Sequence, residues 1–169
     1  MIPESIRQYL DDAGVEYVAR EHPLAVDGSH LAQALRLTGH RIAKALVVRA
    51  GDDRVLVAVP ASSRLDLLAI SHILGAPAEL VDEEELIALF PECEMGAAPP
   101  FGKLFKMPMV LDVALAKPGR MVVRGGTHED AIELDFVDFA DLEDPLVAAV
   151  SYEGEALAGP GFHQGALNI

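Results

Sequence analysis

Two apolar runs joined by a tight turn constrain the fold more than any other feature of the sequence. The runs are Ala45-Leu46-Val47-Val48-Arg49 and Val55-Leu56-Val57-Ala58-Val59, and Gly51-Asp52-Asp53-Arg54 lies between them. Apolar runs rich in β-branched residues on either side of such a turn are typical of a β-hairpin. We therefore expect two antiparallel neighbouring strands in the core of a sheet.

Helical and strand patterns continue along the chain on both sides of this hairpin. Apolar residues at helical spacing predict helices over 4–13, 29–38, 64–74, 83–90 and 135–142, and Ser63 with Asp66 three residues later predicts the start of the third. Further strands are expected over 16–22, 78–81, 107–111, 120–124 and 131–134. These elements follow no regular βαβ order. The sequence predicts an α+β fold with a mixed, mainly antiparallel, barrel-like sheet surrounded by helices.

The length of 169 residues favours one domain, and the charge is unevenly distributed along it. Residues 125–169 contain ten Asp and Glu and no Lys or Arg, so residues 1–124 carry 17 acids against 13 bases out of a total net charge of −14. We expect a domain over 1–144 and an acidic, irregular tail containing Gly and Pro over 145–169. Because acidic surfaces repel nucleic acid, any RNA contact is expected to come from the body of the domain.

The sequence also indicates the cellular compartment of the protein. No uncharged apolar run reaches the ~18–20 residues that a membrane span needs, and the first residues lack a secretion pattern. Cys93 is the only cysteine, which excludes an internal disulfide and favours a reducing cytoplasm. A small buried residue is a more frequent role for a lone cysteine than a nucleophile.

Familiar catalytic motifs are missing. The six histidines show no HxxxH or HxH spacing, so we expect no metal site and no cofactor. There is no GxSxG elbow, no Walker A loop and no GxGxxG after a strand. The sequence therefore lacks the motifs that are typical of common hydrolases, kinases and dehydrogenases.

Three features remain as candidates for a binding site. Lys44 shares a strand face with Leu46, where its side chain either extends to solvent or enters a pocket as a cationic anchor. The run Gly96-Ala97-Ala98-Pro99-Pro100-Phe101-Gly102, called here the 96–102 loop, is either a structural turn or the rigid wall of a small-molecule pocket. A second glycine-rich turn, Gly125-Gly126-Thr127-His128, follows a strand.

The order and spacing of these features resemble the YbaK/EbsC family, the free-standing relatives of the editing domain inserted in bacterial prolyl-tRNA synthetase. The resemblance covers about 2–142. It rests on Lys44 before the first apolar run, on Pro60-Ala61-Ser62-Ser63-Arg64-Leu65-Asp66, and on the 96–102 loop.

The resemblance implies a cytoplasmic trans-editing deacylase that hydrolyses the ester of a mischarged tRNA carrying a small amino acid, with aminoacyl-tRNA and an aminoacyl-tRNA synthetase as partners. Its implied catalytic residues are Lys44, Gly96, Ala97 and Gly102, and its implied substrate-binding residues are Ser63, Arg64, Pro99, Pro100, Phe101 and His128. An ammonium can hold an acceptor of the terminal adenosine, while loop N–H groups polarise the ester carbonyl. Attack by water then needs no protein nucleophile.

Two departures from the family pattern leave the amino acid open. Ala45 stands where several alanine-specific relatives have asparagine, and Ala98-Pro99-Pro100 replaces a serine before a single proline. His128 is either a pocket residue or a surface residue of the turn. The alternative function is a non-catalytic module that binds a nucleotide or a protein and retains the pocket.

Overall fold

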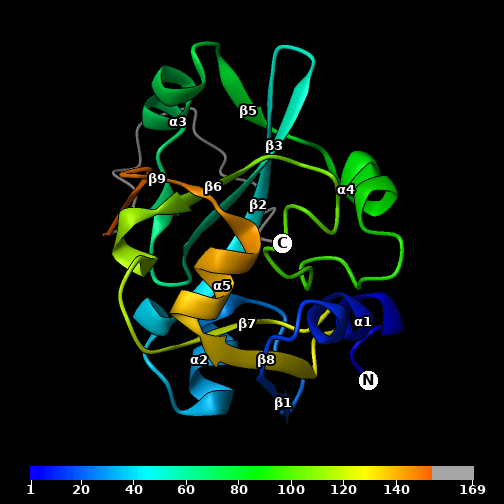
Figure 1. Ribbon diagram of the computed structural model, residues 1–169. Helices are drawn as coiled ribbons and strands as arrows, with labels where there is room; N and C mark the ends of the chain where they lie inside the picture. The colour runs from blue at the N-terminus through cyan, green and yellow to red at the C-terminus, as the bar shows by residue number, and fades with distance from the viewer. Residues whose placement is uncertain (154–169) are drawn as a thin grey trace.

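The predicted hairpin forms the centre of the sheet in the computed structural model, which describes residues 1–153 (Figure 1). Strands β2 (Ile42–Ala50) and β3 (Asp53–Pro60) pair antiparallel, with Lys44 opposite Val59 and Ala50 opposite Asp53. The prediction of two antiparallel neighbours is therefore confirmed.

The other strands extend the sheet on both sides of the hairpin. On the β2 side lie β7 (Arg120–Arg124), β8 (Asp130–Asp135) and β1 (Tyr17–Glu21), and β5 (Ala78–Leu80) also pairs with β2. On the β3 side lie β6 (Met109–Asp112) and β9 (Leu146–Ala148). The β2–β7, β3–β6 and β6–β9 pairs are parallel and the remaining pairs of this sheet are antiparallel. The sheet is mixed and mainly antiparallel, as the sequence predicts.

Within residues 1–153, five α-helices flank the sheet (Figure 1). They are α1 (Glu4–Asp12), α2 (Gly28–Leu35), α3 (Leu67–Leu74), α4 (Glu83–Leu89) and α5 (Phe136–Glu143). A short 3₁₀ turn, η1 (Gly39–Arg41), lies between α2 and β2, and another, η2 (Val113–Leu115), lies between β6 and β7. None of the helices within residues 1–153 is long and apolar enough to span a bilayer.

An aspartate begins each of the last four helices. Asp27, Asp66, Asp82 and Asp135 each accept a hydrogen bond from a backbone N–H of the first turn. The predicted helix start at Ser63 is wrong, because Asp66 caps α3 by accepting from the Ala69 N–H at 3.0 Å. Ser63 instead lies in the turn before β4 (Arg64–Leu65) and donates its N–H to the Pro60 carbonyl.

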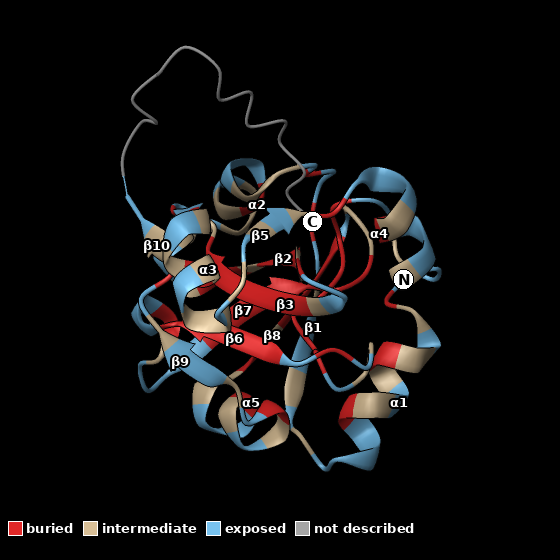
Figure 2. Cartoon of the chain, turned by 90° about the horizontal axis from the view of Figure 1, so that it is seen from above, coloured by how far each residue is buried: buried red, intermediate tan, exposed pale blue. Residues whose placement is uncertain are grey.

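Both faces of the hairpin are buried, which explains why its strands are apolar without alternation. One face packs Val47 and Leu56 against Leu86 of α4, and the other packs Val48 and Val57 against Ile70 of α3. Figure 2 shows β3 and β6 as buried strands at the centre of the molecule, with exposed residues on the surrounding helices.

The chain after α5 corrects one expectation. Residues 146–148 form β9 beside β6, and β10 (Ser151–Tyr152) pairs antiparallel with β4. Val150 between them is fully buried and donates its N–H to Oδ2 of Asp112 at 2.9 Å. The prediction of an irregular segment is therefore wrong for this stretch, while the remainder, including Gly159-Pro160-Gly161, lies outside the described residues.

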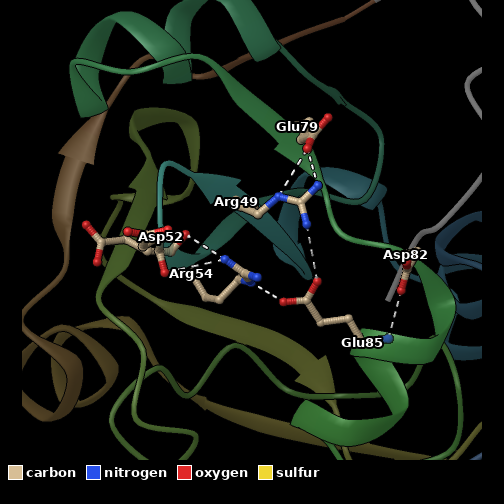
Figure 3. Close-up of polar contacts among 7 residues, drawn as sticks. Arg49, Asp52, Arg54, Glu79, Asp82 and Glu85 are labelled. Atoms are coloured by element: carbon tan, nitrogen blue, oxygen red, sulfur yellow. Dashed lines mark hydrogen bonds and ion pairs between the residues drawn. The ribbon is translucent and has the colours of Figure 1, made fainter.

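At the tip of the hairpin, acidic side chains pair with two arginines (Figure 3). Arg49 binds the carboxylate of Glu79, and Arg54 binds that of Glu85 in the first turn of α4. Asp82 caps the same turn by accepting from the Glu85 N–H at 2.9 Å. These two arginines are therefore engaged within the fold at the end of the hairpin opposite Lys44.

Candidate functional site

Lys44 is the third residue of β2, and its side chain is largely shielded from water. This burial lowers the pKa of Lys44 to about 8, and the positive charge of Arg64 adds to the effect. At pH 7 the ammonium remains the predominant form. An ammonium with little water around it gains more from an anionic or acceptor ligand than an exposed lysine does.

Lys44 lines a small cavity between β2, the start of α2 and the 96–102 loop. The cavity has a volume of about 10 Å³, room for about one water. Its walls include Asp27, Gly28, Ile42, Lys44, Gly96 and Arg124. The structure thus brings together two of the predicted site residues, Lys44 and Gly96, from positions 52 residues apart.

The 96–102 loop is buried along its whole length and is attached to the second glycine-rich turn. The Ala97 carbonyl accepts from the Gly126 N–H at 2.9 Å, and the Ala97 N–H donates to the Glu94 carbonyl at 3.0 Å. Within residues 1–153 the amides of Gly96 and Ala98 have no hydrogen-bond acceptor. Of these two residues only Gly96 lines the cavity, so its N–H is the candidate donor to a ligand there.

The second half of the loop belongs to the hydrophobic core. The Phe101 ring is fully buried, with its centroid 5.7 Å from that of Tyr9 and 6.3 Å from that of Phe139. A Cβ at Gly102 would lie 2.7 Å from the Met107 carbonyl oxygen, so this position accepts only glycine without a shift. Ala97, Pro99, Pro100, Phe101 and Gly102 are buried in the loop without lining the Lys44 cavity.

His128, Ser63 and Arg64 lie around the cavity without forming its walls. The His128 N–H donates to the Glu94 carboxylate at 2.9 Å, and its carbonyl accepts from the Ala25 N–H at 3.0 Å. Ser63 is buried, whereas Arg64 is exposed in β4 and acts on Lys44 through its charge. Of the predicted set, the cavity therefore brings together Lys44 and Gly96 only.

Arg124, at the end of β7, is a cavity residue that the sequence analysis did not identify. Its side chain is buried, and its Nη1 donates to the Ala25 carbonyl at 2.5 Å. Burial lowers the pKa of Arg124, and the nearby Asp27 carboxylate opposes that shift. A basic residue that ends an apolar strand directly before Gly125-Gly126 is the signal that could have found it, since Lys44 begins its apolar run in the same way.

No cluster of three potential metal-ligating side chains occurs in the described part of the chain. The chemistry available in the cavity is therefore that of two cationic side chains, one carboxylate and backbone N–H groups. Such a set suits a ligand with acceptor oxygens, such as a phosphate or an ester.

Comparison with known proteins identifies the family of this α+β fold. The family model described as aminoacyl-tRNA editing domain matches residues 22–142, so the chain belongs to the aminoacyl-tRNA editing domain family. No curated protein sequence matches the chain.

Solved structures share the fold at low sequence identity. The crystal structure of hypothetical protein APE2540 superposes with a TM-score of 0.81 at 20% identity, over 88% of this chain and 100% of that one. A structure described as that of a candidate trans-editing enzyme for prolyl tRNA synthetase gives a TM-score of 0.77 at 24% identity, over 90% and 99% of the two chains. The fold is therefore that of YbaK-like editing domains, as the sequence predicts.

The same fold also occurs within a longer chain. A candidate signal transduction protein from Marinobacter aquaeolei VT8 superposes with a TM-score of 0.74 at 14% identity, over 90% of this chain and 31% of that one. At this identity the likeness concerns the fold alone.

Proposed function

We propose that this protein is a trans-editing deacylase that hydrolyses the ester bond of a mischarged tRNA carrying a small amino acid. The observation that carries the proposal is that Lys44, whose pKa is lowered by burial, and Gly96 of the 96–102 loop line the same small cavity. Membership of the editing-domain family supports the same reaction class.

In the proposed reaction Lys44 anchors the substrate. Its ammonium binds a phosphate or hydroxyl oxygen of the terminal adenosine, which places the aminoacyl ester against the loop. The Gly96 N–H then donates to the ester carbonyl oxygen and stabilises the negative charge that develops when water attacks. The bond from the carbonyl carbon to the ribose 3′-oxygen then breaks, the 3′-oxygen takes up the proton lost by the attacking water, and the free amino acid is released.

A protein nucleophile is not required by this scheme. Cys93 is the only thiol of the chain, and burial raises its pKa to about 11, with Glu92 adding to the effect. A thiol with this pKa is protonated at neutral pH and is a poor nucleophile. It also lines a different cavity, beside Phe90 and Met95.

The small volume of the cavity restricts what it accepts. Space for about one water is too little for an aminoacyl ester, so the walls formed by 26–28 and the 96–102 loop must separate when substrate binds. The closed volume does not set the length of the side chain, and the short side chain is proposed from the resemblance to the editing-domain family. The proposed substrate is therefore a tRNA that carries a small amino acid. The proposed partners are this aminoacyl-tRNA and an aminoacyl-tRNA synthetase.

The test is deacylation of a panel of mischarged tRNAs, including alanyl- and cysteinyl-tRNA for proline, at low ionic strength. Lys44→Ala is expected to reduce the rate about 100-fold, the scale of losing one electrostatic contact to the reacting group. Lys117→Ala, which removes an exposed lysine, serves as the matched control and is expected to retain activity.

Two outcomes would reject the proposal. Unchanged deacylation by Lys44→Ala would exclude the role of this lysine. Salt-dependent binding of tRNA by the wild type without turnover of any substrate would instead indicate a non-catalytic binding module.

A further inference from the structure

Arg124 is held rigidly at the wall of the Lys44 cavity. Arg124 is 4% exposed, and its Nη1 donates a hydrogen bond to the Ala25 carbonyl. Ala25 is itself held in place, because its N–H donates to the His128 carbonyl. The backbone that follows is equally constrained, because a Cβ at Gly125 would lie 3.0 Å from Cβ of Asp130. The guanidinium is therefore held in place by the Ala25 carbonyl, and Arg124 lines the same cavity as Lys44.

Most of the hydrogen-bonding capacity of Arg124 is available to a ligand. A guanidinium has five N–H donors, and within residues 1–153 the hydrogen bond it makes is the one to Ala25. Asp27 is close enough to act on its charge, but both Asp27 oxygens are engaged by His30, at 2.8 Å to its N–H and 2.7 Å to Nδ1. Arg124 thus lines the cavity and, within residues 1–153, has guanidinium donors that are accessible to water and have no protein acceptor.

We propose that Arg124 is the specificity-determining residue of this site and selects a short aminoacyl side chain that ends in a hydrogen-bonding oxygen. This inference rests on the proposed function and names its substrate class. The residue is distinct from the predicted pocket residues, and its contribution comes from its side-chain donors.

The selection follows from the cost of burying unsatisfied donors. An apolar side chain that fills the cavity displaces water from the guanidinium and leaves its N–H groups without acceptors. A hydroxyl or carboxylate oxygen of similar size accepts those hydrogen bonds. Sites built to hydrogen-bond a substrate group discriminate strongly against the analogue that lacks it. Seryl and alanyl esters form a matched pair that differs by one hydroxyl, and the seryl ester is the one that satisfies Arg124.

The test measures binding of adenosine with an amide-linked seryl or alanyl group at the 3′ position, which cannot be hydrolysed. Calorimetry on the wild-type protein is expected to show about tenfold or greater preference for the seryl compound, the scale of one satisfied hydrogen bond to a charged donor. Arg124→Met, which keeps an unbranched side chain without donors, is expected to abolish the preference. Arg49→Met, at the remote hairpin tip, is the matched control and should retain it.

Equal affinity for both compounds, preference for the alanyl compound, binding of neither by the wild type, or an unchanged ratio in Arg124→Met would each overturn the inference. If Arg124→Met does not fold, Arg124→Lys replaces it and is expected to weaken the preference, because an ammonium lacks the planar fork. Hydrolysis of seryl- and alanyl-tRNA is measured separately. A seryl preference in binding without hydrolysis would support the role of Arg124 and reject the proposed reaction.

Discussion

Tyr9 donates its hydroxyl hydrogen to Oε1 of Glu143 over 2.7 Å, and this bond joins α1 to α5. The other oxygen of the same carboxylate accepts from the Lys103 N–H at 3.1 Å. Glu143 is buried, so the carboxylate fixes the chain directly after Gly102 from within the core. The end of the 96–102 loop is therefore held by two helices that lie far from it in sequence.

Glu143→Ala is expected to destabilise the protein by about 2–4 kcal/mol, because it leaves the Tyr9 hydroxyl and the Lys103 N–H buried without an acceptor. Tyr9→Phe takes one of two donors from the buried carboxylate and leaves the Lys103 N–H paired, so it should cost less, about 1–2 kcal/mol. Urea unfolding of the two variants and the wild type measures both values. Equal losses for the two variants would contradict the assigned role of Glu143.

Glu143 should also make stability depend on pH. Burial raises its pKa above the ordinary 4.5, although the hydrogen bonds from Tyr9 and Lys103 oppose the shift. The folded state then keeps a proton that the unfolded state releases, so the contribution of Glu143 is full below about pH 4.5 and decreases as the pH rises through the raised value. The stability of the wild type minus that of Glu143→Gln should therefore fall between pH 4.5 and 7.5 in urea unfolding. A constant or rising difference would exclude the raised pKa.

The parts of the fold that the sequence predicts are those specified by local pattern. The β2–β3 hairpin needs only two apolar runs and a turn, and the aspartate caps of α2 and α4 act within one helical turn. Strand β9 has no such signal, because it is three residues long and its parallel partner β6 lies about 35 residues earlier. Its formation depends on the sheet edge that the rest of the fold provides.

The residues of the candidate site also fall into those that a local pattern predicts and those that depend on the tertiary structure. Lys44 is recognisable because a charged residue begins an apolar strand, and Gly96 because glycine and proline cluster around it. Whether a residue faces the cavity or the core is decided by tertiary packing. This packing places Phe101 near Tyr9 and Phe139 and makes Arg124 line the same cavity as Lys44. These assignments require the positions of β7 and α5 relative to β2.

Gly102→Ala tests the close packing at the end of the loop. The added methyl group would meet the Met107 carbonyl oxygen at 2.7 Å and Cβ of Met109 at 3.0 Å, and neither can move without shifting backbone. The expected cost is about 1–3 kcal/mol in thermal or urea unfolding, the range for overpacking. Gly51→Ala is the comparison, because the methyl group there meets open space and the cost of about 1 kcal/mol comes from its positive φ alone. A smaller loss at Gly102 than at Gly51 would contradict the packing argument.

The charge state of Lys44 should control substrate binding. Burial, with a contribution from Arg64, lowers the pKa of Lys44 to about 8, so the ammonium that binds the substrate is lost as the pH rises through this value. The kcat/KM for deacylation, corrected for spontaneous hydrolysis, should therefore fall above pH 8. Arg64→Gln removes a repelling positive charge and should move the midpoint to higher pH, whereas Lys44→Arg should remove the fall, since a guanidinium stays protonated. A wild-type profile that stays flat or rises between pH 7 and 10 would show that binding does not require the ammonium form of Lys44.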